Sequence, residues 1–129
     1  MRILYVCSGN SFRSPAAEAL TRLHHPDLEV ESAGTSAVGF ISDPALNFLK
    51  DHGAVEFVKP EPDRISQRAV EEADRIVCMM PEHKDYILGN FDVDGSKIEV
   101  WNVKDGILPG VDPQDSMEKV LQKVKSIEE

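Results

Sequence analysis

The sequence contains little cysteine: Cys7 and Cys78 are the only two among 129 residues. Two thiols so far apart in the chain indicate neither a disulfide framework nor a cysteine-based zinc site. Free thiols persist in reducing compartments. We therefore expect a cytoplasmic protein. We also expect it to use no metal ion and no other cofactor.

Positive charge is also scarce. The chain has 14 lysines and arginines against 23 acidic residues, a net charge of −9 and a pI of about 4.9. Proteins that bind nucleic acids or anionic membranes need a basic surface. We therefore expect no nucleic-acid partner and no membrane partner, and we expect very acidic substrates to be disfavoured.

Long apolar runs are missing as well. The run at residues 3–6 is too short for a secretory signal peptide, and no run is long enough to cross a bilayer. No repeat, low-complexity segment or long linker divides the chain. Its length is that of one ordinary domain. We therefore expect a single domain over residues 1–129 that acts as a monomer.

The apolar and charged residues predict alternating strands and helices. Strands are expected at 2–6, 28–32, 75–80 and 97–101, and helices at 14–24, 43–53, 66–73, 81–88 and 117–127. This order predicts an α/β doubly wound sandwich. Its four-stranded parallel sheet should have the strand order 2-1-3-4, with helices on both faces. Ligands of such sheets bind beyond the carboxyl ends of the strands.

One loop follows the first predicted strand and leads into the first predicted helix. It reads Cys7-Ser8-Gly9-Asn10-Ser11-Phe12-Arg13-Ser14-Pro15. Such a loop directs several backbone N–H groups to one point, and the start of a helix adds its unpaired amides and its dipole. Gly9 and Asn10 both tolerate the positive φ that a ring-shaped loop needs. The loop therefore predicts an anion-binding site.

The two ends of this loop suggest its chemistry. A thiol attacks as its thiolate, and a helix N-terminus or a nearby cation favours that form of Cys7. The Arg13 guanidinium can hold two oxygens of a tetrahedral oxyanion. Together they predict in-line transfer of a phosphoryl group to sulfur. Ser14 can cap the helix or hydrogen-bond to Cys7, and Pro15 suits the first helical position.

The loop resembles that of the low-molecular-weight protein tyrosine phosphatase family, whose usual pattern is C-x-G-N-x-C-R-S-P. The matching positions are Cys7, Gly9, Asn10, Arg13, Ser14 and Pro15. Phe12 stands where the family usually has a second cysteine, which can form a reversible disulfide with the nucleophile. The resemblance implies a metal-independent phosphatase that hydrolyses phosphotyrosine proteins or small aryl phosphates through a phosphocysteine. It also implies that residues 8–14 bind the phosphoryl group.

The general acid has two candidates. In the family the acid follows the last strand and precedes a proline. Asp105 lies just beyond the fourth predicted strand, but Gly106 follows it; Asp112 precedes Pro113, seven residues later. We favour Asp105, because the distance from the strand limits the reach of the acid. Asp112 can be explained as a helix start, and either residue can be a solvated loop carboxylate.

Each of four further features of the sequence allows two interpretations. The family shares the tetrapeptide at residues 32–35, where it packs beside the phosphate loop, although a simple turn fits it equally well. Cys78 reads as a core thiol or, less simply, as a redox partner of Cys7. His83 matches a histidine of the family or is a solvated helical residue. Phe40 can replace a tryptophan that lines the family's substrate cleft, or it can belong to the core.

Three rival functions share parts of this pattern. A thioredoxin-coupled arsenate reductase has a similar fold and loop, but it needs two further reactive cysteines, and only Cys78 is available. A phospho-ligand binding or regulatory module with weak turnover would explain the irregular acid loop. A phosphocysteine carrier of a sugar phosphotransferase system also places cysteine after its first strand. Carriers of that kind lack the closing arginine, so Arg13 argues against this third alternative.

Overall fold

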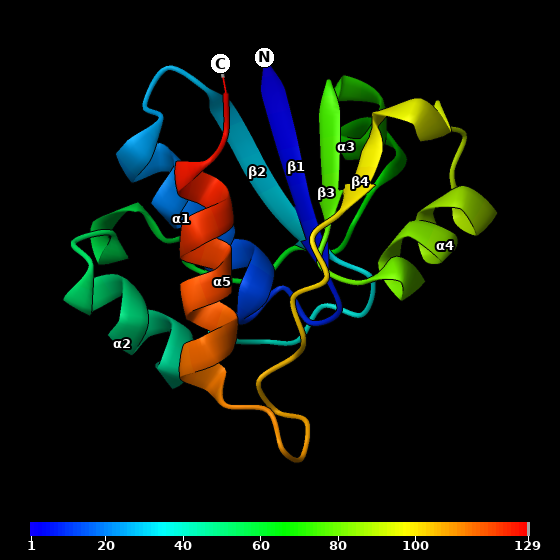
Figure 1. The fold of residues 1–129 in the computed structure, drawn as a ribbon. Helices are drawn as coiled ribbons and strands as arrows, with labels where there is room; N and C mark the ends of the chain where they lie inside the picture. The colour runs from blue at the N-terminus through cyan, green and yellow to red at the C-terminus, as the bar shows by residue number, and fades with distance from the viewer. Residues whose placement is uncertain (129) are drawn as a thin grey trace.

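The computed structural model describes residues 1–128, which fold around one parallel sheet (Figure 1). Its strands are β1 (Arg2–Cys7), β2 (Glu29–Gly34), β3 (Arg75–Cys78) and β4 (Ile98–Val100). They lie in the order β2-β1-β3-β4, and every neighbouring pair is parallel. The predicted sheet and its 2-1-3-4 order are confirmed.

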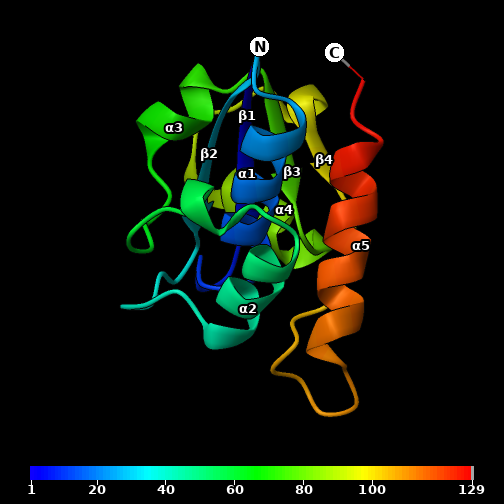
Figure 2. The same ribbon diagram turned by 90° about the vertical axis from the view of Figure 1, so that its left-hand side faces the viewer.

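Helices cover both faces of the sheet, as predicted. The α-helices are α1 (Arg13–His24), α2 (Asp43–Asp51), α3 (Gln67–Glu72), α4 (Pro81–Asn90) and α5 (Pro113–Lys125), and short 3-10 turns occur at Val55–Phe57 and Gly95–Lys97. Figures 1 and 2 place α1, α2 and α5 on one face and α3 and α4 on the other. In the described part of the chain, no helix is both long enough and apolar enough to cross a membrane.

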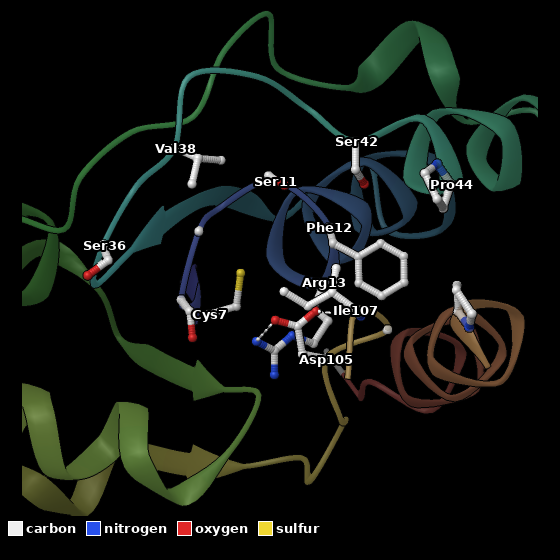
Figure 3. Close-up of a pocket in the computed structure, with 14 residues that line it drawn as sticks. Cys7, Ser11, Phe12, Arg13, Ser36, Val38, Ser42, Pro44, Asp105 and Ile107 are labelled. Atoms are coloured by element: carbon white, nitrogen blue, oxygen red, sulfur yellow. Dashed lines mark hydrogen bonds and ion pairs between the residues drawn. The ribbon is translucent and has the colours of Figure 1, made fainter. Parts of the chain in front are cut away.

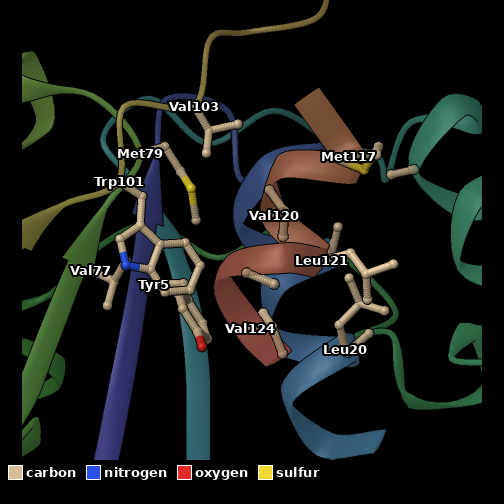
Figure 4. Close-up of a cluster of buried hydrophobic side chains, with 14 of the residues drawn as sticks. Tyr5, Leu20, Val77, Met79, Trp101, Val103, Met117, Val120, Leu121 and Val124 are labelled. Atoms are coloured by element: carbon tan, nitrogen blue, oxygen red, sulfur yellow. The ribbon is translucent and has the colours of Figure 1, made fainter. Parts of the chain in front are cut away.

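The side chains of β1 alternate between two buried clusters. Ile3, Tyr5 and Cys7 point into the cluster beneath α1 and α5, whereas Leu4 and Val6 join the cluster beneath α3 and α4. Figure 4 shows the first cluster, in which the rings of Tyr5 and Trp101 lie 5.3 Å apart. The two-residue period of a strand therefore puts the thiol of Cys7 on the α1 side of the sheet.

Several predicted helix ends are wrong. α1 begins at Arg13, so Pro15 is its third helical residue rather than its first. α2 has Ser42 at its N-cap position, one residue before Asp43. α4 continues through Gly89 to Asn90, because Phe91 N–H still bonds to the carbonyl of Ile87 and so extends the helical hydrogen bonding past the glycine.

Asp112 marks the start of α5, which is the alternative interpretation given for it from the sequence. Its side chain caps the helix by accepting a 2.9 Å hydrogen bond from Gln114 N–H, and Pro113 is the first helical residue. The helix therefore begins at residue 113, four residues before its predicted start.

Candidate active site

A cavity of about 320 Å³ opens at the carboxyl ends of the strands, between the loop after β1 and the segment after β4 (Figure 3). Three groups of residues line it: Cys7, Ser8, Gly9, Ser11, Phe12 and Arg13 from the loop; Ser36, Val38, Ser42 and Pro44; and Asp105, Gly106, Ile107 and Pro113. The fold thus brings Cys7 and Arg13 together with Asp105, which lies 92 residues after Arg13 in the sequence.

The loop bends at Asn10, which has a φ of 51° and lies in the left-handed region, as predicted. Gly9, which would also tolerate a positive φ, does not adopt one, so Asn10 makes the left-handed turn of this loop. Gly34 at the end of β2 lets the loop approach closely: a Cβ atom there would lie 2.5 Å from the Ser8 carbonyl oxygen. The tetrapeptide at residues 32–35 therefore does pack beside the loop.

Ser14 bonds to the sulfur rather than capping α1. The distance between Cys7 Sγ and Ser14 Oγ is 2.9 Å, and the first turn of α1 has no side-chain cap. Ser14 Oγ also accepts a 2.8 Å hydrogen bond from Asn10 Nδ2. The hydroxyl proton of Ser14 is therefore available for donation to Sγ.

Arg13 connects the loop to the segment after β4. Its guanidinium is buried, donates to the Val103 carbonyl oxygen at 3.0 Å and reaches Asp105 Oδ2 at 3.5 Å. The dashed line in Figure 3 marks the contact with Asp105. Nε of Arg13 has no hydrogen-bond partner among the described residues. A buried unpaired donor is costly, so this atom is suited to an anion bound in the cavity.

The two candidate acids occupy different places. Asp105 lines the cavity and is partly exposed, with its Oδ2 next to Arg13. Asp112 caps α5 and does not line this cavity. Of these two candidates, Asp105 is the one that shares a cavity with Cys7.

His83 is not the solvated helical residue of one interpretation. It is 1% exposed. Its Nδ1 accepts from Met80 N–H at 3.0 Å, so the proton of the neutral ring lies on Nε2, which is 2.9 Å from Ser8 Oγ. Burial, and then the positive charge of Arg13, lower the pKa of His83 from 6.5 to about 4. A neutral His83 thus supports the loop through its hydrogen bond with Ser8.

This histidine should make the protein less stable in acid. Unfolded chains protonate histidine near pH 6.5, whereas folded His83 resists protonation until about pH 4. The free energy of unfolding should therefore fall as the pH drops through this window, by up to about 3 kcal/mol from this residue. Between pH 7 and pH 5, urea unfolding should show that the free energy of unfolding falls by about 2 kcal/mol more in the wild type than in His83→Gln. Equal losses in the two proteins would contradict this assignment.

Phe12 and Gly106 fit against each other across the cavity. A Cβ atom on Gly106 would lie 2.8 Å from two ring atoms of Phe12 and 3.0 Å from Pro113 Cα. A residue larger than glycine therefore cannot follow Asp105 while the ring of Phe12 keeps its place. The two departures from the family pattern, at residues 12 and 106, thus meet in space.

Gly106→Ala should consequently destabilise the protein. Overpacking costs about 1–3 kcal/mol, which outweighs the gain of about 0.4–1 kcal/mol from reduced flexibility of the unfolded chain. Urea unfolding should show that Phe12→Leu removes most of this penalty when the two changes are combined. Gly89→Ala is the matched control, because a Cβ atom there meets nothing within 4 Å, and it should be neutral or stabilising. A Gly106→Ala protein as stable as the wild type would disprove the steric conflict.

Two aliphatic residues, not Phe40, form the outer walls. Phe40 is 66% exposed and belongs neither to the cavity lining nor to the core, so both interpretations of it are wrong. Val38 and Ile107 are exposed residues that do line the cavity. Their position could not be read from the sequence, since apolar loop residues lack a periodic pattern.

Cys78 is a core thiol. It is buried in the cluster on the α3 and α4 side, and burial raises its pKa to about 12. Cys7 belongs to the cluster on the opposite face. The sheet therefore separates the two sulfurs, and Cys78 is poorly placed as a redox partner.

Comparisons with known proteins agree with this architecture. The profile of the family described as "Low molecular weight phosphotyrosine protein phosphatase" matches residues 2–125. The low molecular weight protein-tyrosine-phosphatase Wzb of Escherichia coli is 41% identical over 83 residues, which cover 63% of this chain and 56% of Wzb. The match thus spans little more than half of that relative.

Two solved structures, each 25% identical in sequence, superpose closely. The low molecular weight phosphotyrosine phosphatase VcLMWPTP-2 of Vibrio cholerae O395 has a TM-score of 0.85, covering 96% of this chain and 92% of that one. The YwlE arginine phosphatase of Geobacillus stearothermophilus has a TM-score of 0.82, covering 95% and 87%. Both comparisons extend over nearly the whole sheet and its helices.

Proposed function

Because the chain belongs to the low molecular weight phosphotyrosine protein phosphatase family, we propose that it hydrolyses phosphotyrosine-type monoesters through a cysteinyl phosphate. One observation carries the proposal: Cys7 Sγ, hydrogen-bonded to Ser14 Oγ, lies in the same cavity as Arg13 and Asp105. Nucleophile, anion-binding group and acid are thus within one site.

In the first step the Cys7 thiolate attacks phosphorus. A sulfur–phosphorus bond forms, the ester bond breaks, and its electron pair passes to the leaving oxygen. Asp105 as the carboxylic acid gives that oxygen its proton. Arg13 and the backbone N–H groups of residues 8–14 hold the phosphoryl oxygens. Arg13 exchanges its contact with Asp105 for these oxygens, which frees the acid.

In the second step water attacks the phosphocysteine. Asp105, now a carboxylate, takes a proton from the water as the new oxygen–phosphorus bond forms. The sulfur leaves with the electron pair of the broken bond, and phosphate departs. The thiolate of Cys7 and the acid form of Asp105 are regenerated, so no metal or other cofactor takes part.

The shape of the cavity supports an aromatic leaving group. Phe12, Val38 and Ile107 present apolar surface beside Cys7, and such surface favours a ring over a charged side chain. The Geobacillus protein is named an arginine phosphatase, and a phosphoarginine substrate would place a guanidinium there. Asp105 is the only acidic side chain in the described lining, and it is already assigned to proton transfer.

The rival functions find less support. An arsenate reductase would need its further thiols close to Cys7, and Cys78 lies on the other face of the sheet. The position of Arg13 beside the cavity argues against a phosphocysteine carrier. A binding module with weak turnover would not need an acid inside the cavity, where Asp105 lies.

The test is turnover of p-nitrophenyl phosphate, a phosphotyrosine peptide and phosphoarginine in the presence of EDTA. We expect hydrolysis of both aryl phosphates, and rapid acid quenching should trap a phosphoryl group on the Cys7 peptide in a mass map. Tight phosphate binding without turnover would favour the binding module instead. Preferred hydrolysis of phosphoarginine would overturn the proposed substrate class.

We further propose that the protein acts as a monomer in the cytoplasm, without a nucleic-acid or membrane partner. The two unpaired cysteines support a reducing compartment. The net charge of −9 argues against a nucleic-acid partner and an anionic-membrane partner. Light scattering during size-exclusion chromatography tests the oligomeric state, and fractionation of cells tests the location.

A further inference from the structure

Lys59 is a buried cation behind the loop that carries Cys7. Its side chain is only 8% exposed. Its Nζ donates to Asn10 Oδ1 at 2.9 Å and to the Ser32 carbonyl oxygen at 2.8 Å, and it pairs with Asp63 Oδ2 at 2.8 Å. These three short contacts account for the three protons of the ammonium group, and a longer one of 3.3 Å reaches Ser32 Oγ.

The side-chain amide of Asn10 is completely bonded by this arrangement. Its Oδ1 accepts from Lys59 Nζ and from Asp63 N–H, at 2.9 and 2.8 Å. Its Nδ2 donates to Ser14 Oγ at 2.8 Å and to Ser32 Oγ at 3.0 Å. Every donor and acceptor position of the amide is therefore occupied.

The orientation of this amide determines whether Cys7 Sγ receives a hydrogen bond from Ser14. With Nδ2 toward Ser14, the serine hydroxyl accepts from Asn10 and donates its own proton to Cys7 Sγ, 2.9 Å away. If the amide were reversed, its oxygen would face Ser14 and would take that proton. An amide takes whichever orientation its partners select, and the ammonium group of Lys59 accepts no hydrogen bond. Asp63 N–H cannot accept one either, so Lys59 and Asp63 N–H together require the oxygen on their side.

We propose that Lys59 is a positioning residue that, together with Asp63 N–H, fixes the direction of the hydrogen-bond chain Lys59–Asn10–Ser14–Cys7, so that the chain ends in a donor to the sulfur. The inference rests on the proposed role of Cys7 as nucleophile. It concerns the readiness of the sulfur to react and not the later steps of hydrolysis.

Other charges face the two ends of this chain. Arg13 and Asp105 line the cavity around Cys7, and His83 reaches it through Ser8. Glu18 receives the hydrogen bond of Ser32 Oγ at 2.6 Å and also pairs with Arg22. Asp63 pairs with Lys59 itself. Substitution of Lys59 therefore removes the partner of Asp63 and a positive charge near Glu18. Among the described residues, Arg13, Asp105 and His83 form no direct hydrogen bond or ion pair with Lys59.

The experiment measures the alkylation rate of Cys7 by iodoacetamide against pH, with modification located by peptide mass mapping. Lys59→Met should move the midpoint of this profile upward by about one pH unit. At a given pH on the rising limb, the alkylation rate should then be roughly tenfold lower. Lys97→Met is the matched control, because Lys97 Nζ donates to the carbonyl oxygens of Val70 and Ala73, away from the loop. Its midpoint should not move.

A double-mutant cycle separates orientation from simple charge. In a Ser14→Ala background the last link is missing, so adding Lys59→Met should cause no further shift. An equal shift in both backgrounds would overturn the proposal, because the charge would then act directly. So would an unmoved midpoint in a Lys59→Met protein with wild-type near-ultraviolet circular dichroism. Since alkylation needs no turnover, a failed phosphatase assay would leave this result interpretable.

Discussion

Cys7→Ser should reduce the hydrolysis of p-nitrophenyl phosphate by about 10⁴-fold or more. A serine hydroxyl in this loop ionises far less readily than a thiol, and the donor that Ser14 directs at Sγ cannot compensate for that difference. The measurement is kcat at saturating substrate. Phosphate binding by calorimetry should survive, because Arg13 and the loop amides are retained.

The matched control is Cys78→Ala, which removes the other thiol. Cys78 lies in the core on the opposite face of the sheet, so this change should lower stability by about 2 kcal/mol or less and leave kcat within about twofold. If Cys7→Ser kept most of the activity, or if Cys78→Ala lost it, the assignment of the nucleophile would be wrong.

Asp105→Asn should lower kcat by about 10²- to 10³-fold for phenyl phosphate. An asparagine cannot give a proton to the leaving oxygen. The loss should be smaller for p-nitrophenyl phosphate, because its leaving group departs more easily without protonation. This dependence on the leaving group distinguishes a missing acid from a displaced loop, which would impair both substrates alike.

Asp112→Asn is the control for this prediction. Asparagine caps helices about as well as aspartate, so α5 should keep its start and kcat should stay within about twofold. A large loss in Asp112→Asn, together with an active Asp105→Asn protein, would move the acid to residue 112. Rates should be compared at several pH values, because an acid that acts on the leaving oxygen gives the falling limb of the pH profile.

The sequence was sufficient for the sheet, because its signal is local and repeated. Continuous apolar runs predicted β1 and β3, and the expected strand order followed from the alternation of strands with helices. The position of Asp105 in the cavity was also foreseeable, since parallel strands end at one edge of the sheet. Helix ends were less accurate, because Gly89 can end a helix or continue one and only tertiary contacts decide.

What the sequence could not reveal depends on contacts between distant segments. The burial of His83 depends on its contact with Ser8, 75 residues away, and Lys59 meets Asn10 across 49 residues. Neither histidine nor lysine carries a sequence signal for burial. The steric relation of Phe12 and Gly106 was equally hidden, although both positions stood out as departures from the family pattern.

The bond from Arg13 to the Val103 carbonyl oxygen joins positions ninety residues apart, which has a consequence during synthesis. A nascent chain that has left the ribosome only as far as α4 already contains Cys7, but it lacks the segment that holds the guanidinium and supplies the acid. Under the proposed mechanism, such an incomplete chain cannot release phosphate. We therefore expect catalysis to begin only when the last third of the polypeptide has been translated and docked, and we expect separately expressed halves to be inactive until they reassemble.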